Sequence, residues 1–369
     1  MIRKEQFQEA LQRRMKFSRK KPLDRIPLNY MVIGAPVKYD MIERCNSSAA
    51  AVEQFLINEK HTLENFPEGD HIPIFNLDYL GEGVIPSMFG AEQVPVKDLP
   101  PFTRGRVMDD LETDLPKLKQ EINPETDGWG PIAKDAVERF IDATRGEIRV
   151  TNVDIQSPYG IATKLIGNEK LMFAMYDTPE LVHELFDICT KAIIDTTNAV
   201  IKWAGGAQNV ALNVCEPYDD TGISMYDDYV SVISPDLSNE FCLPHNQKIF
   251  EAFGGRGYYH TCGPYFPGYM SAVLANKPRI MDMVTLRGAL QKSREDMLEV
   301  KKICVQNDIF LSGDLAAYPN GQYDFDSHIQ PDEDFVRRMC ADGRTLWTAW
   351  GTAERGRELL EYCRECINS

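Results

Sequence analysis

Short apolar runs alternate with stretches of helical periodicity throughout the last two thirds of the chain. The apolar runs are bounded by turn-forming residues, which is typical of buried strands. Between two of them, Leu181, Leu185 and Ile188 recur at the spacing of one helix face, after Thr178-Pro179 and before Gly205-Gly206. This alternation indicates repeated βα units around a parallel sheet.

Eight of the apolar runs are predicted to be strands: residues 26–33, 72–77, 148–155, 209–215, 257–262, 280–284, 309–312 and 345–349. Eight parallel strands are the number that closes a barrel. We therefore predict an α/β protein with one domain over 1–369, folded as a distorted (β/α)8 TIM barrel. Ser234-Pro235 is predicted to open a helix that Pro244 kinks, and Ser293, Asp332 and Thr352 are predicted N-caps of the last three helices.

Two segments fall outside the repeating pattern. Residues 1–21 are predicted to form an N-terminal helical extension. Its cationic part, residues 13–21, is expected to be a solvated helix end and loop, with a local docking site for an anionic partner as the alternative. Residues 90–146 show only weak helical periodicity and contain Pro95, Pro100, Pro101, Pro116, Pro124 and Pro131. We predict that this second segment is an irregular excursion after the second strand, which caps the barrel mouth.

Charge and cysteine usage restrict the classes of function. The formal net charge of −16 argues against nucleic acid or an anionic membrane surface as a partner, because both select basic patches. Nine cysteines are scattered along the chain without a secretion signal, and no apolar run is long enough to cross a bilayer. We therefore expect a cytoplasmic protein with free thiols. Nucleotide-binding loops and the Gly-x-Ser-x-Gly elbow of serine hydrolases are missing from the sequence.

His260 and Cys262 stand two residues apart at the end of the fifth predicted strand, before Gly263-Pro264. Alternate residues of a strand share a face, so both side chains are predicted to point the same way. An imidazole and a thiol on one face make half of a zinc site. The spacing by itself favours a simpler interpretation, a buried cysteine beside a histidine that hydrogen-bonds to backbone.

Other cysteines have a simpler interpretation. Cys363 and Cys366 share one face of the last predicted helix with Leu359, so we predict packing rather than a Cys-x-x-Cys metal or redox site. Cys340 is likewise predicted to lie on the apolar face of the helix before the eighth strand.

The loops after the predicted strands carry the remaining candidate groups, since catalytic residues of barrels gather at the carboxyl ends of the strands. Asp219, Asp220 and Asp314 are candidate catalytic acids, although each could instead cap its loop. Cys215 and Glu216 are neighbours that alternate in facing, so at most one of them is expected to point inward. The candidate substrate-binding residues are Asp78, Tyr159, Tyr218 and Trp350.

With these residues in view, the chain resembles the uroporphyrinogen decarboxylase superfamily from about residue 22 to about residue 362. The resemblance rests on the order and spacing of several short motifs. They are Arg25-Ile26-Pro27, Ser157-Pro158-Tyr159-Gly160-Ile161-Ala162-Thr163 with Gly167, Asp177-Thr178-Pro179-Glu180, Asp219-Asp220, Ser234-Pro235 through Leu243-Pro244, His260-Thr261-Cys262-Gly263 and Ser312-Gly313-Asp314-Leu315. The resemblance implies a distorted (β/α)8 barrel with its active site in the mouth.

That superfamily has two branches with different chemistry. The decarboxylases resemble one another in an arginine-rich loop after strand one and a histidine after strand eight, where this chain has residues 32–36 (VIGAP) and 349–352 (AWGT). A substrate with eight carboxylates needs cationic partners, so these loops argue against porphyrinogen decarboxylation. The corrinoid-dependent methyltransferases hold zinc through a His-x-Cys after strand five, which His260 and Cys262 match.

The resemblance therefore implies zinc as a cofactor and a corrinoid (cobalamin) supplied by a partner protein. The expected reaction moves a methyl group between that corrinoid protein and a small methyl donor or thiol acceptor. The third ligand of the family is expected just after strand eight, but Trp350-Gly351 stands there. Glu216 is our candidate to complete the set, with Asp314 and Cys215 as alternatives. A metal-free decarboxylase or lyase, using Asp78, Asp219 or Asp220, and a non-catalytic barrel that binds a corrinoid or another small ligand remain the other hypotheses.

Overall fold

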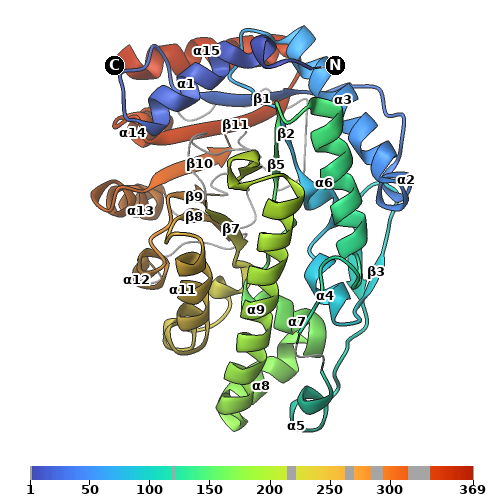
Figure 1. The fold of residues 1–369 in the computed structure, drawn as a ribbon. Helices are drawn as coiled ribbons and strands as arrows, with labels where there is room; N and C mark the ends of the chain where they lie inside the picture. Colours follow the sequence, from blue (N-terminus) through green and yellow to red (C-terminus); the bar gives the residue numbers. More distant parts are fainter. Residues whose placement is uncertain are drawn as a thin grey trace.

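The computed structural model describes residues 2–118, 121–213, 222–261, 270–283, 294–314 and 333–368 (Figure 1). Its strands are β1 (Leu28–Val32), β2 (Ile74–Phe75), β3 (Glu92–Val94), β4 (Phe102–Arg104), β5 (Arg149–Thr151), β6 (Val210–Ala211), β7 (Ile223–Tyr226), β8 (Gly257–His260), β9 (Ile280–Met283), β10 (Phe310–Asp314) and β11 (Thr345–Gly351). Its α-helices are α1 (Gln8–Ser18), α2 (Met41–Asn46), α3 (Ser48–Asn65), α4 (Val84–Met88), α5 (Leu111–Asp114), α6 (Gly130–Thr144), α7 (Pro158–Ile166), α8 (Asn168–Asp177), α9 (Pro179–Trp203), α10 (Pro235–Leu237), α11 (Leu243–Ala252), α12 (Met270–Ala275), α13 (Arg294–Gln306), α14 (Glu333–Cys340) and α15 (Ala353–Asn368).

Parallel pairing dominates the described strands. A six-stranded sheet has the order β1-β11-β10-β9-β8-β7, and a three-stranded sheet has the order β2-β5-β6. The two sheets meet where the Tyr226 amide donates to the Ile155 carbonyl and the Ser157 amide donates to the Tyr226 carbonyl, both at 2.8 Å. The predicted α/β class with parallel sheets is confirmed. Within the described ranges, however, the strand pairs form these two sheets and the β3–β4 hairpin, not one closed ring.

Each of the eight predicted strands overlaps a strand of the structure, but β7 and the β3–β4 hairpin were not predicted. β7 is only four residues long, and it is extended because it pairs with β8 in parallel register from Ile223–Gly257 to Tyr226–His260. Such pairing is a tertiary effect with no local signature.

The prediction that residues 90–146 are irregular was wrong for their last part. α6 runs from Gly130 to Thr144 and buries Ala133, Ala136, Val137 and Phe140, which follow the i, i+3, i+4, i+7 spacing of one helix face. Pro131 lies in its first turn, where the missing amide hydrogen costs no helical hydrogen bond. The prolines that suggested irregularity therefore include one that starts a helix.

Helix boundaries follow the predicted caps where the structure describes them. Ser234 accepts a hydrogen bond from the Leu237 amide, and Thr352 Oγ1 accepts one from the Arg355 amide. The predicted kink at Pro244 takes the form of a π-helical turn over Ser238–Cys242, directly before α11. Ser293 and Asp332 lie outside the described residues. Within the described part of the chain, no helix is both long and apolar enough to span a membrane.

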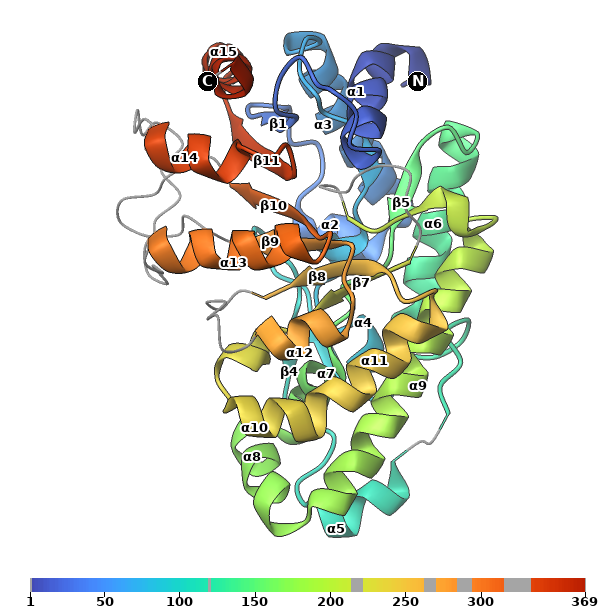
Figure 2. The same cartoon turned by 90° about the vertical axis from the view of Figure 1, so that its left-hand side faces the viewer.

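Two apolar clusters pack on the two faces of the six-stranded sheet. The larger cluster includes Tyr259, Met281, Leu311 and Trp347 and joins the sheet to helices such as α13 and α15, which lie along one side of it (Figure 2). The smaller cluster lies on the other face, which we call the inner face. It comprises Phe17, Leu212, Tyr258, Ile280, Phe310 and Leu346, with the Phe17 ring of α1 centred 4.7 Å from that of Phe310.

The predicted N-terminal helix is present as α1, but its cationic end is not simply solvated. Arg14 is buried, and Arg13 donates to both Asp24 and Asp70. Asp70 is fully buried and also accepts hydrogen bonds from the Arg25 guanidinium and the Leu28 amide. This carboxylate therefore ties α1 to the start of β1.

Replacing Asp70 by asparagine is expected to lower the free energy of unfolding by about 3–5 kcal/mol, because two guanidinium groups would lose their buried counter-charge. Asp24→Asn is the matched control, since Asp24 pairs with the same Arg13 but is largely exposed. Urea denaturation of both variants measures the difference. Equal, small losses would show that the burial of Asp70 does not determine its contribution.

Candidate active site

The inner face of the six-stranded sheet changes from apolar to polar along each strand. On each of four neighbouring strands, this face carries an apolar side chain of the smaller cluster and then, two residues later, a polar side chain. The pairs are Tyr258 and His260 on β8, Ile280 and Asp282 on β9, Phe310 and Ser312 on β10, and Leu346 and Thr348 on β11. The strand periodicity therefore collects polar groups at the carboxyl ends of the strands, above a closed apolar layer.

His260 is held between two carboxylates. Its Nδ1 lies 2.7 Å from Asp282 Oδ2, and its Nε2 lies 3.5 Å from Asp228 Oδ1. Ser312 Oγ donates to the other oxygen of Asp282 at 3.1 Å. Burial alone would raise the pKa of Asp282, but the hydrogen bond and charge of His260, together with hydrogen bonds from Tyr258 and Ser312, outweigh it and lower the pKa below its usual value. Asp282 thus stays ionised and orients the imidazole with Nε2 toward Asp228.

Tyr226, at the end of β7, connects His260 to a second group of acids. Its ring centroid lies 5.1 Å from that of His260, and its hydroxyl donates to Asp78 Oδ2 at 3.2 Å while accepting from Asn213 Nδ2 at 3.1 Å. The Asp78 amide in turn donates to Asn76 Oδ1 at 2.9 Å. Side chains from both sheets therefore meet at one place.

Asp154, after β5, completes this group. Burial, and after it the charge of the nearby Asp78 carboxyl, raise the pKa of Asp154 to about 8. Gln156 Nε2 donates to Asp154 Oδ1 at 2.8 Å. Burial also raises the pKa of Asp78. Burial and the charges of Asp78 and Asp154 together raise the pKa of Tyr226. At neutral pH Asp154 is therefore mostly protonated and can donate a hydrogen bond or a proton.

A fully buried carboxyl supports the loop beneath these groups. Asp227 accepts hydrogen bonds from the Ser157 hydroxyl at 2.8 Å, from Asn246 Nδ2 at 2.9 Å and from the Tyr259 hydroxyl at 2.8 Å. Its amide donates to the His260 carbonyl at 2.8 Å. Asp227 therefore fixes the backbone on both sides of the His260–Asp228 contact.

The structure brings some of the sequence-predicted residues together. Asp78 and His260 belong to the same cluster. Trp350 lies opposite Met31 in the β1–β11 register, and both are partly exposed. Asp314 ends β10 opposite Thr348.

Other predicted residues lie elsewhere. Tyr159 is fully buried in α7, donates to Asn168 Oδ1 at 2.9 Å and packs against Phe186 and Tyr229. The candidates that lie outside the described residues are Cys215, Glu216, Tyr218, Asp219, Asp220 and Cys262.

Sequence reasoning missed Asp154, Tyr226, Asp228 and Asp282. Asp154 and Asp282 lie inside predicted strands, and a charged residue within an apolar run is a signal for a functional site that could have been used. Tyr226 ends β7 and Asp228 comes two residues later; because this strand was not predicted, no local pattern marked either residue.

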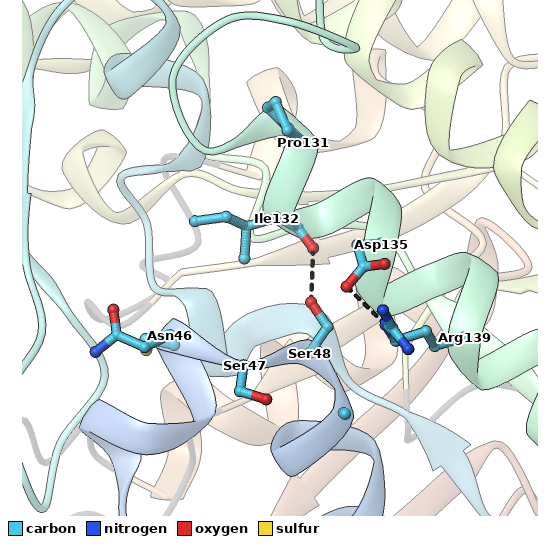
Figure 3. Close-up of a pocket in the computed structure, with 9 residues that line it drawn as sticks. Asn46, Ser47, Ser48, Pro131, Ile132, Asp135 and Arg139 are labelled. Carbon is cyan, nitrogen blue, oxygen red and sulfur yellow. Dashed lines mark hydrogen bonds and ion pairs between the residues drawn. The ribbon is translucent and has the colours of Figure 1, made fainter.

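A surface hollow of about 430 Å³ lies apart from this cluster, between α6 and the α2–α3 junction (Figure 3). Ser48 Oγ donates to the Ile132 carbonyl across it, and Asp135 pairs with Arg139 on its wall. None of the acids around His260 lines it. In the described part of the chain, no three His, Cys, Asp or Glu side chains are placed so as to hold a metal ion by themselves.

Comparisons with known proteins bear on the family. The family model described as uroporphyrinogen decarboxylase (URO-D) matches residues 83–306. No curated protein matches the sequence. A methyltransferase from Methanosarcina mazei is similar in structure, with a TM-score of 0.66 and 17% identity over 98% of this chain and 99% of that chain. At that identity the likeness shows a shared fold. Because the family model covers more than half of its residues, this chain belongs to the uroporphyrinogen decarboxylase family.

Proposed function

We propose that this chain is a zinc-dependent methyltransferase, which moves a methyl group between a corrinoid protein and a small methyl donor or thiol acceptor. The observation that carries the proposal is the 2.7 Å contact between His260 Nδ1 and Asp282. A carboxylate on one imidazole nitrogen is the usual support for a histidine that binds metal through the other nitrogen. The fold shared with the Methanosarcina mazei methyltransferase is consistent with this proposal.

The donor set fits zinc in chemical type. His260 Nε2 would be one ligand and Cys262, two residues on, would be another, with Glu216 as our candidate third ligand. Asp228 Oδ1, 3.5 Å from Nε2, is an additional oxygen donor at the same place. When bound, zinc supplies a Lewis acid that lowers the pKa of a thiol or polarises the atom that carries the methyl group.

The acids around His260 give the chain its own part in the reaction. Protonated Asp154, with Tyr226 and Asp78, can donate a hydrogen bond or a proton to an oxygen or nitrogen that loses its methyl group. The charges that raise the pKa of Asp154 come from Asp78, Glu82 and Asp228. Such surroundings repel polycarboxylates, which favours a neutral or cationic small substrate over a porphyrinogen.

The arrangement of strands is also compatible with the barrel expected for the family. We infer that the two parallel sheets form two arcs of one distorted (β/α)8 barrel. The backbone hydrogen bonds between Ile155, Ser157 and Tyr226 join the arcs on one side and support this inference.

We further propose that the protein acts in the cytoplasm. The described cysteines are all free thiols, which suits a reducing compartment. A corrinoid protein is the proposed partner.

A metal-free decarboxylase or lyase is the second candidate. One observation favours it: a carboxyl with a pKa of about 8, beside a second buried carboxyl, is suited to protonating a carbanion after carbon dioxide leaves. This candidate needs no metal, so an apoprotein would keep its activity.

The test begins with zinc analysis of protein purified anaerobically without chelators, followed by demethylation of methylcobalamin against a panel of small thiols. We expect roughly one zinc per chain and thiol-dependent loss of the methylcobalamin absorbance. Turnover by zinc-free protein would support the decarboxylase or lyase instead. Retention of the corrinoid without any turnover would indicate a binding barrel.

A further inference from the structure

A groove lies at the amino ends of the strands, opposite the carboxyl ends where the candidate active site lies. Its volume is about 880 Å³, and it is bordered by the residues after α1, the loop between α14 and β11, and the end of α15. The loop from Cys340 to Arg344 precedes β11, whereas His260 and Asp282 follow the apolar residues of β8 and β9. The inner apolar cluster with Phe17 lies between the two places along the strands. The groove is therefore separate from the candidate active site.

The walls of the groove are strongly cationic. One acid, Asp342, lines it together with five basic residues, which are Lys20, Lys21, Arg337, Arg338 and Arg344. Asp308, nearby, pairs with Lys20 and Arg344, and Asp342 pairs with Lys301 at 3.1 Å. Even after these ion pairs the wall keeps an excess of positive charge, in a chain whose formal net charge is −16. A concentration of cations on an acidic protein selects anionic ligands.

Two thiols also line this groove. Cys340 ends α14 and Cys366 lies in the last turn of α15, and their side chains hydrogen-bond to each other. Trp347 Nε1 donates to Cys340 Sγ at 3.0 Å. Cys366 is only 6% exposed, so a reagent has to enter the groove to reach it. The sequence pattern predicted packing for these cysteines, and the structure adds that two of them meet in a groove.

The two thiols differ in acidity. The hydrogen bond from Cys340 lowers the pKa of Cys366 to about 7 in spite of burial, and the positive charge of Arg337 acts in the same direction. The same hydrogen bond, with burial, raises the pKa of Cys340 well above its usual value. Cys363, in the turn before, has a raised pKa because of its burial and does not line the groove. Cys366 is thus the thiol of the pair that ionises near neutral pH.

We propose that this groove binds an anionic low-molecular-weight disulfide and exchanges with it through Cys366 and Cys340. The Cys366 thiolate attacks one sulfur of the bound disulfide, forms a mixed disulfide and releases one small thiolate. Cys340 then loses its proton, attacks Cys366 Sγ and releases the second small thiol. The balance is one small disulfide reduced to two thiols and one Cys340–Cys366 disulfide formed. This inference does not depend on the proposed methyltransferase function.

The test uses oxidised glutathione as an anionic probe, 2-hydroxyethyl disulfide as a neutral one and cystamine as a cationic one, on the reduced full-length chain. Peptide mass spectrometry follows each cysteine with time. We expect Cys366 to react fastest with the anionic probe, more slowly with the neutral one and slowest with the cationic one. A Cys340–Cys366 cross-linked peptide should accumulate. Cys45 is the internal reference, because it lines the other hollow but burial raises its pKa to about 11.

Three variants separate the steps. Cys340→Ser should stop at one glutathione on Cys366, and Cys366→Ser should leave Cys340 unmodified. Arg337→Gln should slow the reaction with oxidised glutathione roughly three- to tenfold relative to the reaction with cystamine. If Cys340→Ser fails to fold, the cross-linked peptide from wild type still reports the second step. Equal reactivity of Cys45 and Cys366, or no dependence on probe charge, would overturn the proposal.

Discussion

His260→Ala is expected to lose its zinc and at least about 100-fold of its methyl-transfer rate, the largest effect that we predict for a single substitution. The imidazole would be the one nitrogen ligand of the proposed set, and the alanine cannot replace it. Zinc content and methylcobalamin demethylation, measured on the same preparations, check both effects. Cys262→Ser should behave in the same way.

Two further variants make this experiment specific. Asp282→Asn keeps His260 but replaces its ionised partner at 2.7 Å, so we expect zinc affinity to fall by about 10- to 100-fold without complete loss. His183→Gln, on α9, removes a histidine that stacks on Phe241 and should leave the zinc content unchanged. Full zinc occupancy in His260→Ala would refute the proposed metal site, whatever its activity.

Asp154→Asn is expected to lower the turnover rate by about 100-fold and to abolish the alkaline limb of its pH profile. The wild-type acid is protonated below about pH 8, so the wild-type rate should fall as the pH rises through that value. Asparagine keeps the size of the side chain and an oxygen for Gln156, but it has no proton to donate. Steady-state rates between pH 6 and pH 9.5 would measure the change.

The same substitution should stabilise the fold. The pKa of Asp154 rises from 3.8 to about 8 on folding, so the wild type loses stability as the pH increases between those values. Asparagine removes this loss, and the melting temperature of the variant should exceed that of wild type by a few degrees at pH 8.5 but not at pH 4. Asp142→Asn, an exposed acid at the end of α6, is the control. For the rate measurement, an unchanged alkaline limb in the pH profile of Asp154→Asn would exclude Asp154 as the catalytic acid.

The alternation of apolar runs and helical stretches was sufficient to predict an α/β protein with parallel strands and to locate eight of them. It also predicted the helix that starts at Pro179 and the disturbance before Pro244. These features depend on residues close together in the sequence, since strand and helix periodicity and proline geometry are local properties. The family resemblance rests on the order of short motifs, which are also local features of the sequence. The match of the family model confirms it.

The sequence by itself also marked Asp78 and His260, because Asp78 follows one predicted strand and His260 lies at the end of another. It did not show that they share one cluster, nor that Tyr226 joins them, since the contact depends on β7 pairing with β8 and on the meeting of the two sheets. The carboxylates of Asp154 and Asp282 have opposite pKa shifts, which only their surroundings determine. Likewise, Cys340 and Cys366 are 26 positions apart in the sequence, and only the packing of α14 against α15 brings their thiols together in a cationic groove.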